Sequence, residues 1–71
     1  MREEIKELCE ALGWIDLGPQ KNIYMMSFRE EETGRRVNIY PTAMTVTVED
    51  INHIQRHYHD VTLEKLEEIL A

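Results

Sequence analysis

Apolar residues near the start of the chain recur with the period of a helix. They are Ile5, Leu8, Cys9 and Leu12, which have the i, i+3, i+4, i+7 spacing of a single helical face. The glutamates among the first seven residues suit the positive end of a helix dipole. Gly13 follows the last of these apolar positions, and glycine there readily takes the left-handed conformation that ends many helices. The pattern predicts a helix from Met1 to Leu12.

The centre of the chain is typical of strands that bury one face. Apolar and polar side chains alternate along its last two segments, and the first is rich in Ile, Tyr, Met and Phe without any Pro or Gly. A polar turn with a glycine near its end separates the first two segments, and a proline ends the second. The predicted antiparallel strands are Asn22–Arg29, Arg35–Tyr40 and Met44–Val48.

Two stretches have a less regular pattern. A Gly-Pro pair is a turn signal, so residues 14–19 are predicted to be a connector that lays Trp14 and Leu17 on the core. Residues 50–60 fit either a helix with three apolar residues on one face or a turn followed by a strand. We favour the second interpretation, with a fourth strand from Ile54 to Val61.

A second amphipathic helix closes the chain. Thr62 is a favourable N-cap, and the apolar residues that share one face after it are Leu63, Leu66, Ile69 and Leu70. The order is therefore helix, three or four antiparallel strands, helix. Two helices on one face of such a meander give a two-layer α+β sandwich, a single domain over residues 1–71. The predicted core consists of Val37, Ile39, Met44, Val46, Leu8, Leu12, Leu66 and Leu70.

The charge balance narrows the classes of partner. Fourteen acidic residues against eight Lys and Arg give a formal net charge of −6, and such a chain repels nucleic acid unless one face is locally basic. A chain this short has a thin core, which makes self-association a source of added stability. A single cysteine, no apolar run of membrane-spanning length and first residues unlike a signal peptide lead us to expect a cytoplasmic setting without membrane contact.

The strands also predict a polar face. If their apolar residues face the helices, the opposite side of the sheet holds Arg36, Asn38, Tyr40, Thr45 and Thr47. Strand propensity alone is one explanation for Thr and Tyr at such positions. The other is recognition, because an arginine, an asparagine and a tyrosine side by side can hold a carboxylate, a phosphate or a base. These five residues are the candidate binding site.

The histidines and the cysteine are candidates for chemistry. On a strand, His57 and His59 would share a face, whereas on a helix His53 and His57 would do so without the H-E-x-x-H motif of zinc proteases. No further ligand is positioned by spacing, so we predict no metal site and keep His57 and His59 as secondary candidates. Cys9 lies on an apolar helix face and is predicted to be a core residue. We predict no catalytic residues and no cofactor.

The segment RVNIYPTAMTV, residues 36–46, resembles a hairpin in a family of small uncharacterised eukaryotic α/β proteins with the pattern R-[IV]-N-[VI]-[YW]-x-T-x-x-T-V. An Asn-His turn, a strand and a helix follow in that family, and residues 51–70 would supply them. The family's basic segment before the last strand is missing here, and the resemblance implies a fold without a function. The element order is also similar to double-stranded-RNA-binding domains and to toxin ribonucleases of the HicA type, although their basic residues and Gly-Ser-His segment are absent.

Three functions are compatible with these features. We expect a non-enzymatic binding or interaction module that uses the exposed sheet face or a sheet edge, with another protein or a second copy of the chain as its partner. A small hydrolase or metal-site protein that uses the histidine cluster is one alternative. The other is a nucleic-acid-binding domain with a basic patch of Arg29, Arg35, Arg36 and Arg56.

Overall fold

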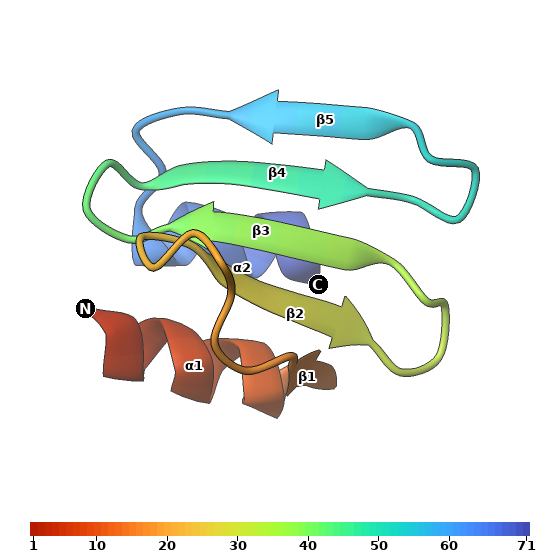
Figure 1. Cartoon of the computed structure of the whole chain (residues 1–71). Coiled ribbons are helices and arrows are strands. Elements are labelled where there is room, and N and C mark those ends of the chain that lie inside the picture. Colours follow the sequence, from red (N-terminus) through yellow and green to blue (C-terminus); the bar gives the residue numbers. More distant parts are fainter.

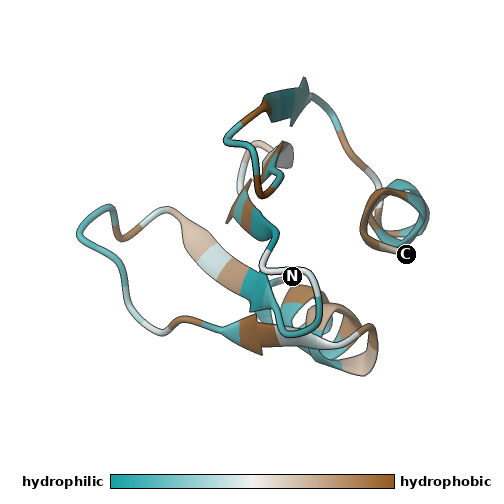
Figure 2. Cartoon of the chain, turned by 90° about the vertical axis from the view of Figure 1, so that its right-hand side faces the viewer, coloured by the Kyte–Doolittle hydropathy of each residue, from teal (hydrophilic) through white to brown (hydrophobic).

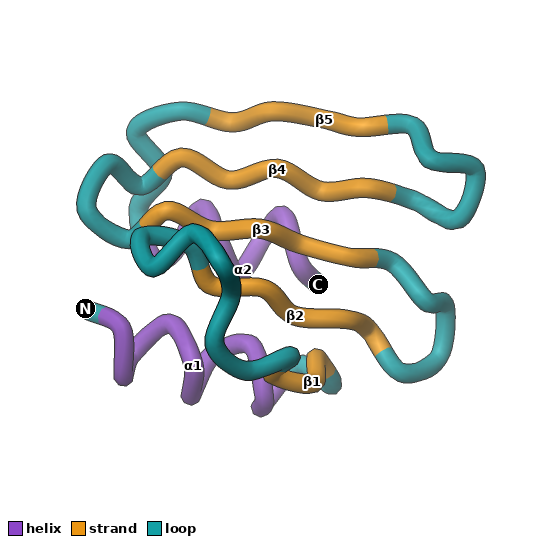
Figure 3. Tube along the Cα trace, viewed as in Figure 1, coloured by secondary structure: helices purple, strands orange, loops and turns teal.

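The computed structural model describes residues 1–71 and places two helices against an antiparallel sheet (Figure 1). The elements are α1 (Arg2–Ala11), β1 (Trp14–Asp16), β2 (Met26–Glu30), β3 (Arg36–Tyr40), β4 (Thr45–Glu49), β5 (Gln55–Tyr58) and α2 (Leu63–Leu70). Each strand pairs with the next one in the chain, so the five-stranded sheet is a simple meander (Figure 3). The predicted α+β sandwich is confirmed, with one strand more than expected. No helix is long and apolar enough to cross a membrane.

Both helices form where the apolar periodicity predicted them. Gly13 follows the C-cap of α1 with a φ of 91°, the left-handed conformation expected of it. Thr62 caps α2, because its hydroxyl oxygen accepts the backbone N–H of Lys65 at 3.1 Å. The two helices lie on the same side of the sheet, whereas the β1–β2 loop projects from the other side (Figure 2).

The extra strand, β1, lies where a connector was predicted. Its central residue, Ile15, is paired with Arg29 of β2. Trp14 is buried as expected, whereas Leu17 is only half-buried. A segment of three residues is too short for its alternation to distinguish a strand from a connector, which is why the prediction was wrong here.

The strand predicted from Asn22 begins only at Met26. The side-chain oxygen of Asn22 accepts a hydrogen bond from the backbone N–H of Tyr24 at 3.0 Å, and the backbone carbonyl of Asn22 accepts one from the N–H of Met25 at 3.1 Å. Asparagine closes such turns with its own side chain. This local bonding overrides the strand propensity of the residues that follow, so residues 22–25 belong to the β1–β2 loop.

The ambiguous segment before α2 contains a strand, as predicted. The carboxylate of Asp50 accepts the backbone N–H groups of Asn52 and Ile54 at 2.8 and 3.1 Å. His53 takes a φ of 64° and completes the turn. The chain then enters β5, which pairs with β4 and is shorter at both ends than the predicted Ile54–Val61.

The core lies between the helices and the inner face of the sheet, the face that carries Val37 and Ile39. The buried apolar residues are Ile5, Cys9, Trp14, Phe28, Val37, Ile39, Val46, Val48, Val61, Leu66 and Leu70. Five of the eight predicted core residues are in this cluster. The other three, Leu8, Leu12 and Met44, are partly buried and pack against its margin.

Cys9 is a core residue, as predicted. Its side chain is fully buried. Burial is the largest cause that raises the pKa of the thiol from its ordinary 9.0 to about 12, and the negative charges of Asp16 and Glu10 act in the same direction. The thiol is therefore uncharged at neutral pH and behaves as a small apolar group.

A chain of contacts joins the β2–β3 hairpin to the end of α2. The guanidinium carbon of Arg35 lies 5.1 Å from the centroid of the Trp14 ring, and Arg35 Nε donates to the carboxylate of Glu30 at 2.7 Å. Trp14 Nε1 donates to the carbonyl of Leu70 at 3.3 Å. The hydrogen bond from Arg35 is the largest cause that lowers the pKa of Glu30 from its ordinary 4.5, and the bond from the Thr33 hydroxyl also lowers it.

The core position of Val46 predicts a large effect of a charge there. Val46→Asp buries an unpaired carboxylate, which costs several kcal/mol, a large part of the stability of a small domain. We expect a non-cooperative thermal melt by circular dichroism. Thr47→Asp is the matched control. The side chain of Thr47, the next residue along β4, points to the outer face of the sheet, so this variant should still melt cooperatively. A wild-type melt for Val46→Asp would contradict the strand register.

The low pKa of Glu30 predicts a pH-dependent stability. A carboxyl group with a depressed folded-state pKa stabilises the fold above its ordinary 4.5, and this contribution is lost as the pH falls through the lower folded-state value. Glu30→Gln should therefore lower the free energy of unfolding at neutral pH by a few tenths to about 1 kcal/mol, and this difference should vanish in acid. Urea denaturation across this pH range measures it. Glu32→Gln, which changes an exposed residue of the same turn, is the matched control.

Candidate functional site

The five predicted binding residues lie together on the outer face of the sheet, the face directed away from α2. Their cross-strand partners place Asn38 beside Thr47 and Tyr40 beside Thr45, while Arg36 lies beside Glu49. All five are half-buried, because neighbouring side chains flank them on both sides. The outer face is thus a continuous polar surface across β3 and β4.

The β1–β2 loop covers the β2 side of this face. The backbone N–H of Leu17 donates to the carbonyl of Ser27 at 2.9 Å, and Ser27 is fully buried. Ser27 Oγ donates to Asn38 Oδ1 at 2.6 Å and lies 3.4 Å from Arg36 Nη2. Ser27, which is not among the predicted site residues, therefore fixes the positions of two of them.

Two arginines face each other across the β2–β3 pair. Arg29 is the direct partner of Arg36. The bond from Glu30 N–H to the Arg35 carbonyl makes theirs a non-hydrogen-bonded pair, the kind in which the Cα atoms are about 4.5 Å apart and the side chains are closest. Like charges in this position destabilise a sheet.

Neither of these guanidinium groups forms a salt bridge, although Arg36 lies beside Glu49 and its positive charge is the smallest of the causes that lower the pKa of that carboxyl. The ion pairs of the chain involve other residues, and Arg36 Nε is buried without a hydrogen-bond partner. The two helices hold seven glutamates against three basic residues. The outer-face strand positions hold these two arginines against one glutamate, Glu49, so this face is less acidic than the helices.

A hollow of about 490 Å³ opens beside the two arginines, between the β2–β3 and β4–β5 hairpins. Its acidic residues already have hydrogen-bond donors. Glu49 accepts from Gln55 Nε2 and from His53 Nδ1, each at 2.9 Å, and the bond from Gln55 is the largest cause that lowers the pKa of Glu49. Asp50 accepts the turn amides described above. The residues that line the hollow are Arg29, Gly34, Arg36, Glu49, Asp50, Ile51 and His53.

The basic patch considered for nucleic acid is divided between the two faces of the sheet. Arg29 and Arg36 lie on the outer face. Arg56 is paired with the buried Val48 and lies on the inner side, where it lines a separate hollow of about 120 Å³ with Arg35. The four arginines therefore do not form one surface for a phosphate backbone.

The histidines make pairwise contacts rather than a metal site. His57 Nδ1 lies 3.0 Å from Thr47 Oγ1, on the outer face, and His53 is paired with Glu49. His59 follows β5 and is exposed. No three His, Cys, Asp or Glu side chains lie close enough to hold a metal ion together.

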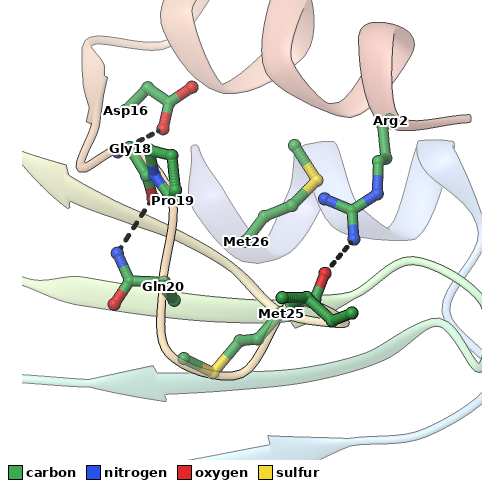
Figure 4. A pocket seen from close by; sticks show the side chains of 8 residues that line it. Arg2, Asp16, Gly18, Pro19, Gln20, Met25 and Met26 are labelled. Carbon is green, nitrogen blue, oxygen red and sulfur yellow. Dashed lines mark hydrogen bonds between the residues drawn. The ribbon is translucent and has the colours of Figure 1, made fainter.

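A further hollow, of about 320 Å³, lies between the start of α1 and the β1–β2 loop (Figure 4). Arg2 Nη2 donates to the carbonyl of Ile23 at 2.7 Å, Gln20 Nε2 donates to that of Gly18 at 3.0 Å, and Asp16 accepts the N–H of Gly18 at 2.8 Å. These polar groups hold the loop in place. This hollow was not predicted, because the apolar residues 23–25 favour a strand where the structure has a loop. The turn-forming Asn22 is the signal in the sequence that points to the loop.

The facing arginines predict that one of them lowers stability. Arg29→Thr removes the repulsion and leaves a residue that favours strands. The free energy of unfolding should rise by a few tenths to about 1 kcal/mol at low ionic strength, and the gain should shrink as salt screens the charges. Urea denaturation at low and high salt measures this. Lys21→Thr, which removes an exposed cation in the β1–β2 loop, should leave stability almost unchanged; a destabilised Arg29→Thr would contradict the repulsion.

Comparison with known proteins leaves the site to be interpreted on its own geometry. No family model, no curated protein and no solved structure matches the chain.

Proposed function

We propose that this chain is a non-enzymatic binding module whose outer sheet face holds an acidic segment of a partner protein. The observation that carries the proposal is the pair of arginines without a salt bridge, Arg29 and Arg36, side by side beside an open hollow. Two positive charges so placed reduce stability in the free protein. A bound carboxylate would convert this repulsion into attraction.

The chemistry of the guanidinium group indicates which anion fits. Arginine presents a planar set of N–H donors that match the two oxygens of a carboxylate, and such charge-assisted bonds are stronger than neutral ones. The buried Nε of Arg36 lacks an acceptor in the free protein. A carboxylate that enters the hollow can supply acceptors to both arginines at once.

The neighbouring residues extend the polar surface along β3 and β4. Asn38 already accepts a hydrogen bond from Ser27 at Oδ1, so its amide nitrogen is oriented and has no partner. Tyr40 and Thr45 add hydroxyl groups further along the same face. This row of donors and acceptors fits the backbone and side chains of a peptide that crosses the sheet.

Two features support binding rather than catalysis. The buried Ser27 and Cys9 are out of reach of solvent, and the thiol of Cys9 is protonated at neutral pH. Thr47 contacts His57, but no third group orients the imidazole, as a nucleophile and base require. The division of the arginines between two faces favours a protein partner over nucleic acid.

A titration with a capped peptide rich in Asp and Glu tests the proposal. We expect amide chemical-shift changes in β3 and β4, and an affinity at least about tenfold weaker for the double variant Arg29→Gln, Arg36→Gln, because hydrogen bonds to charged groups contribute about 1.5–3 kcal/mol each. The double variant Lys21→Gln, Lys65→Gln makes the same change in net charge elsewhere and should bind like wild type. Absence of binding, or tighter binding of single-stranded or duplex RNA, would overturn the proposal.

A further inference from the structure

We propose that the free edge of β5 accepts an extended acidic segment of a partner protein as a sixth strand of the sheet. The inference deepens the proposed function and rests on it for the acidic nature of the partner. It adds a second contact region, because β5 lies at the end of the strand order, apart from the arginines of β2 and β3.

The hydrogen-bond ladder leaves the backbone of β5 open on one side. Asp50 N–H donates to the carbonyl of Ile54 at 3.1 Å, and hydrogen-bonded pairs recur at every second residue of an antiparallel ladder. The backbone groups of Arg56 and Tyr58 therefore point towards β4. Those of Gln55 and His57 point away from the sheet, and no residue of the chain bonds to them.

The edge of β5 carries few of the features that block strand addition. It contains neither proline nor lysine and has no bulge in its pairing with β4. Its first three residues are exposed. The opposite edge differs, because β1 is only three residues long and α1 packs against it. Of the two edges, β5 is the one that a partner strand can reach.

The charge of this edge selects an acidic occupant. Residues 51–59 contain Arg56 and three histidines and no acidic residue, in a chain of net charge −6. Arg56 lies on the inner side, in the wall of the small hollow, and forms no salt bridge. Arg35 in the same wall is already paired with Glu30, and the carboxylate of Asp50, which also lines the hollow, accepts the turn amides. A carboxylate on an incoming strand would meet the guanidinium group of Arg56. A second copy of the chain would instead bring an equally basic edge and a further net charge of −6.

His57 offers a substitution that blocks only strand addition. Its N–H points away from β4, so His57→Pro removes a donor from the open edge without removing one from the β4–β5 ladder, and proline is tolerated at such edge positions. His57→Val is the matched control, because it also loses the contact with Thr47 but keeps the N–H. Both variants should unfold at similar temperatures.

The probe is a short capped peptide in which glutamate and valine alternate. Wild type and His57→Val should bind this peptide and show changes in the amide chemical shifts of β5. His57→Pro should bind it with an affinity at least about tenfold lower. The same peptide with lysine in place of glutamate should not bind. Equal binding by His57→Pro and His57→Val would overturn the inference, as would a concentration-dependent dimer in sedimentation that His57→Pro abolishes.

Modified peptides test the edge on the wild-type protein, even if His57→Pro does not fold. N-methylation of alternate backbone nitrogens should abolish binding for one set of positions and spare it for the other, since only one set can face β5. Equal effects of the two sets would overturn strand addition. If the Arg29→Gln, Arg36→Gln variant no longer binds the peptide while His57→Pro still binds it, the proposed function holds and this inference fails. If His57→Pro loses the peptide while the double arginine variant keeps it, the edge of β5 is the binding site and the proposed role of the outer face fails.

Discussion

The burial of alternate aliphatic side chains on the central β3–β4 hairpin is the constraint on which the rest of the molecule depends. Val37, Ile39, Val46 and Val48 all face the helices. Each contributes about 1.5–3 kcal/mol when buried, so the four together are comparable with the whole stability of a small domain. A slip of one residue would turn all of one strand's apolar side chains to solvent. The membership of the outer face is therefore fixed by what the inner face buries.

The extent of helical cover determines which surfaces stay free. Two short helices, of ten and eight residues, cover the sheet only as far as β4 has buried side chains. β5 has none, and its inner positions carry Arg56 and the half-buried Tyr58. On the other side, the β1–β2 loop covers Ser27 but leaves the row from Arg36 to Tyr40 accessible. The candidate surfaces are thus the parts of the sheet that neither the two helices nor the β1–β2 loop covers.

The sequence predicts those parts of the structure in which one periodicity dominates. Both helices, the β3–β4 hairpin and the five residues of the outer face follow from alternation or helical spacing alone. The start of β2 does not, because the side-chain bonding of Asn22 outweighs the strand propensity of its neighbours. The sequence also does not predict that Arg29 and Arg36 lie opposite each other. In the segment before Arg29, apolar residues occupy both alternating sets of positions, so alternation does not show which set faces the core. The register of β2 is set instead by the strands that pair with it. The periodicity of apolar residues does not identify the chemistry of a binding partner, which depends on individual side chains and their surroundings.

Because Cys9 is buried, the rate at which its thiol is chemically modified reports how often the core opens. An alkylating reagent is attacked by the thiolate of a cysteine, whereas the Cys9 thiol is both covered by the core and held protonated. Labelling therefore requires the core around Cys9 to open, and because the chain has a single cysteine, every modified molecule records such an opening. A ligand that binds only the closed form slows such labelling by mass action. The rate of a simple alkylation thus measures partner binding at surfaces that contain no cysteine at all.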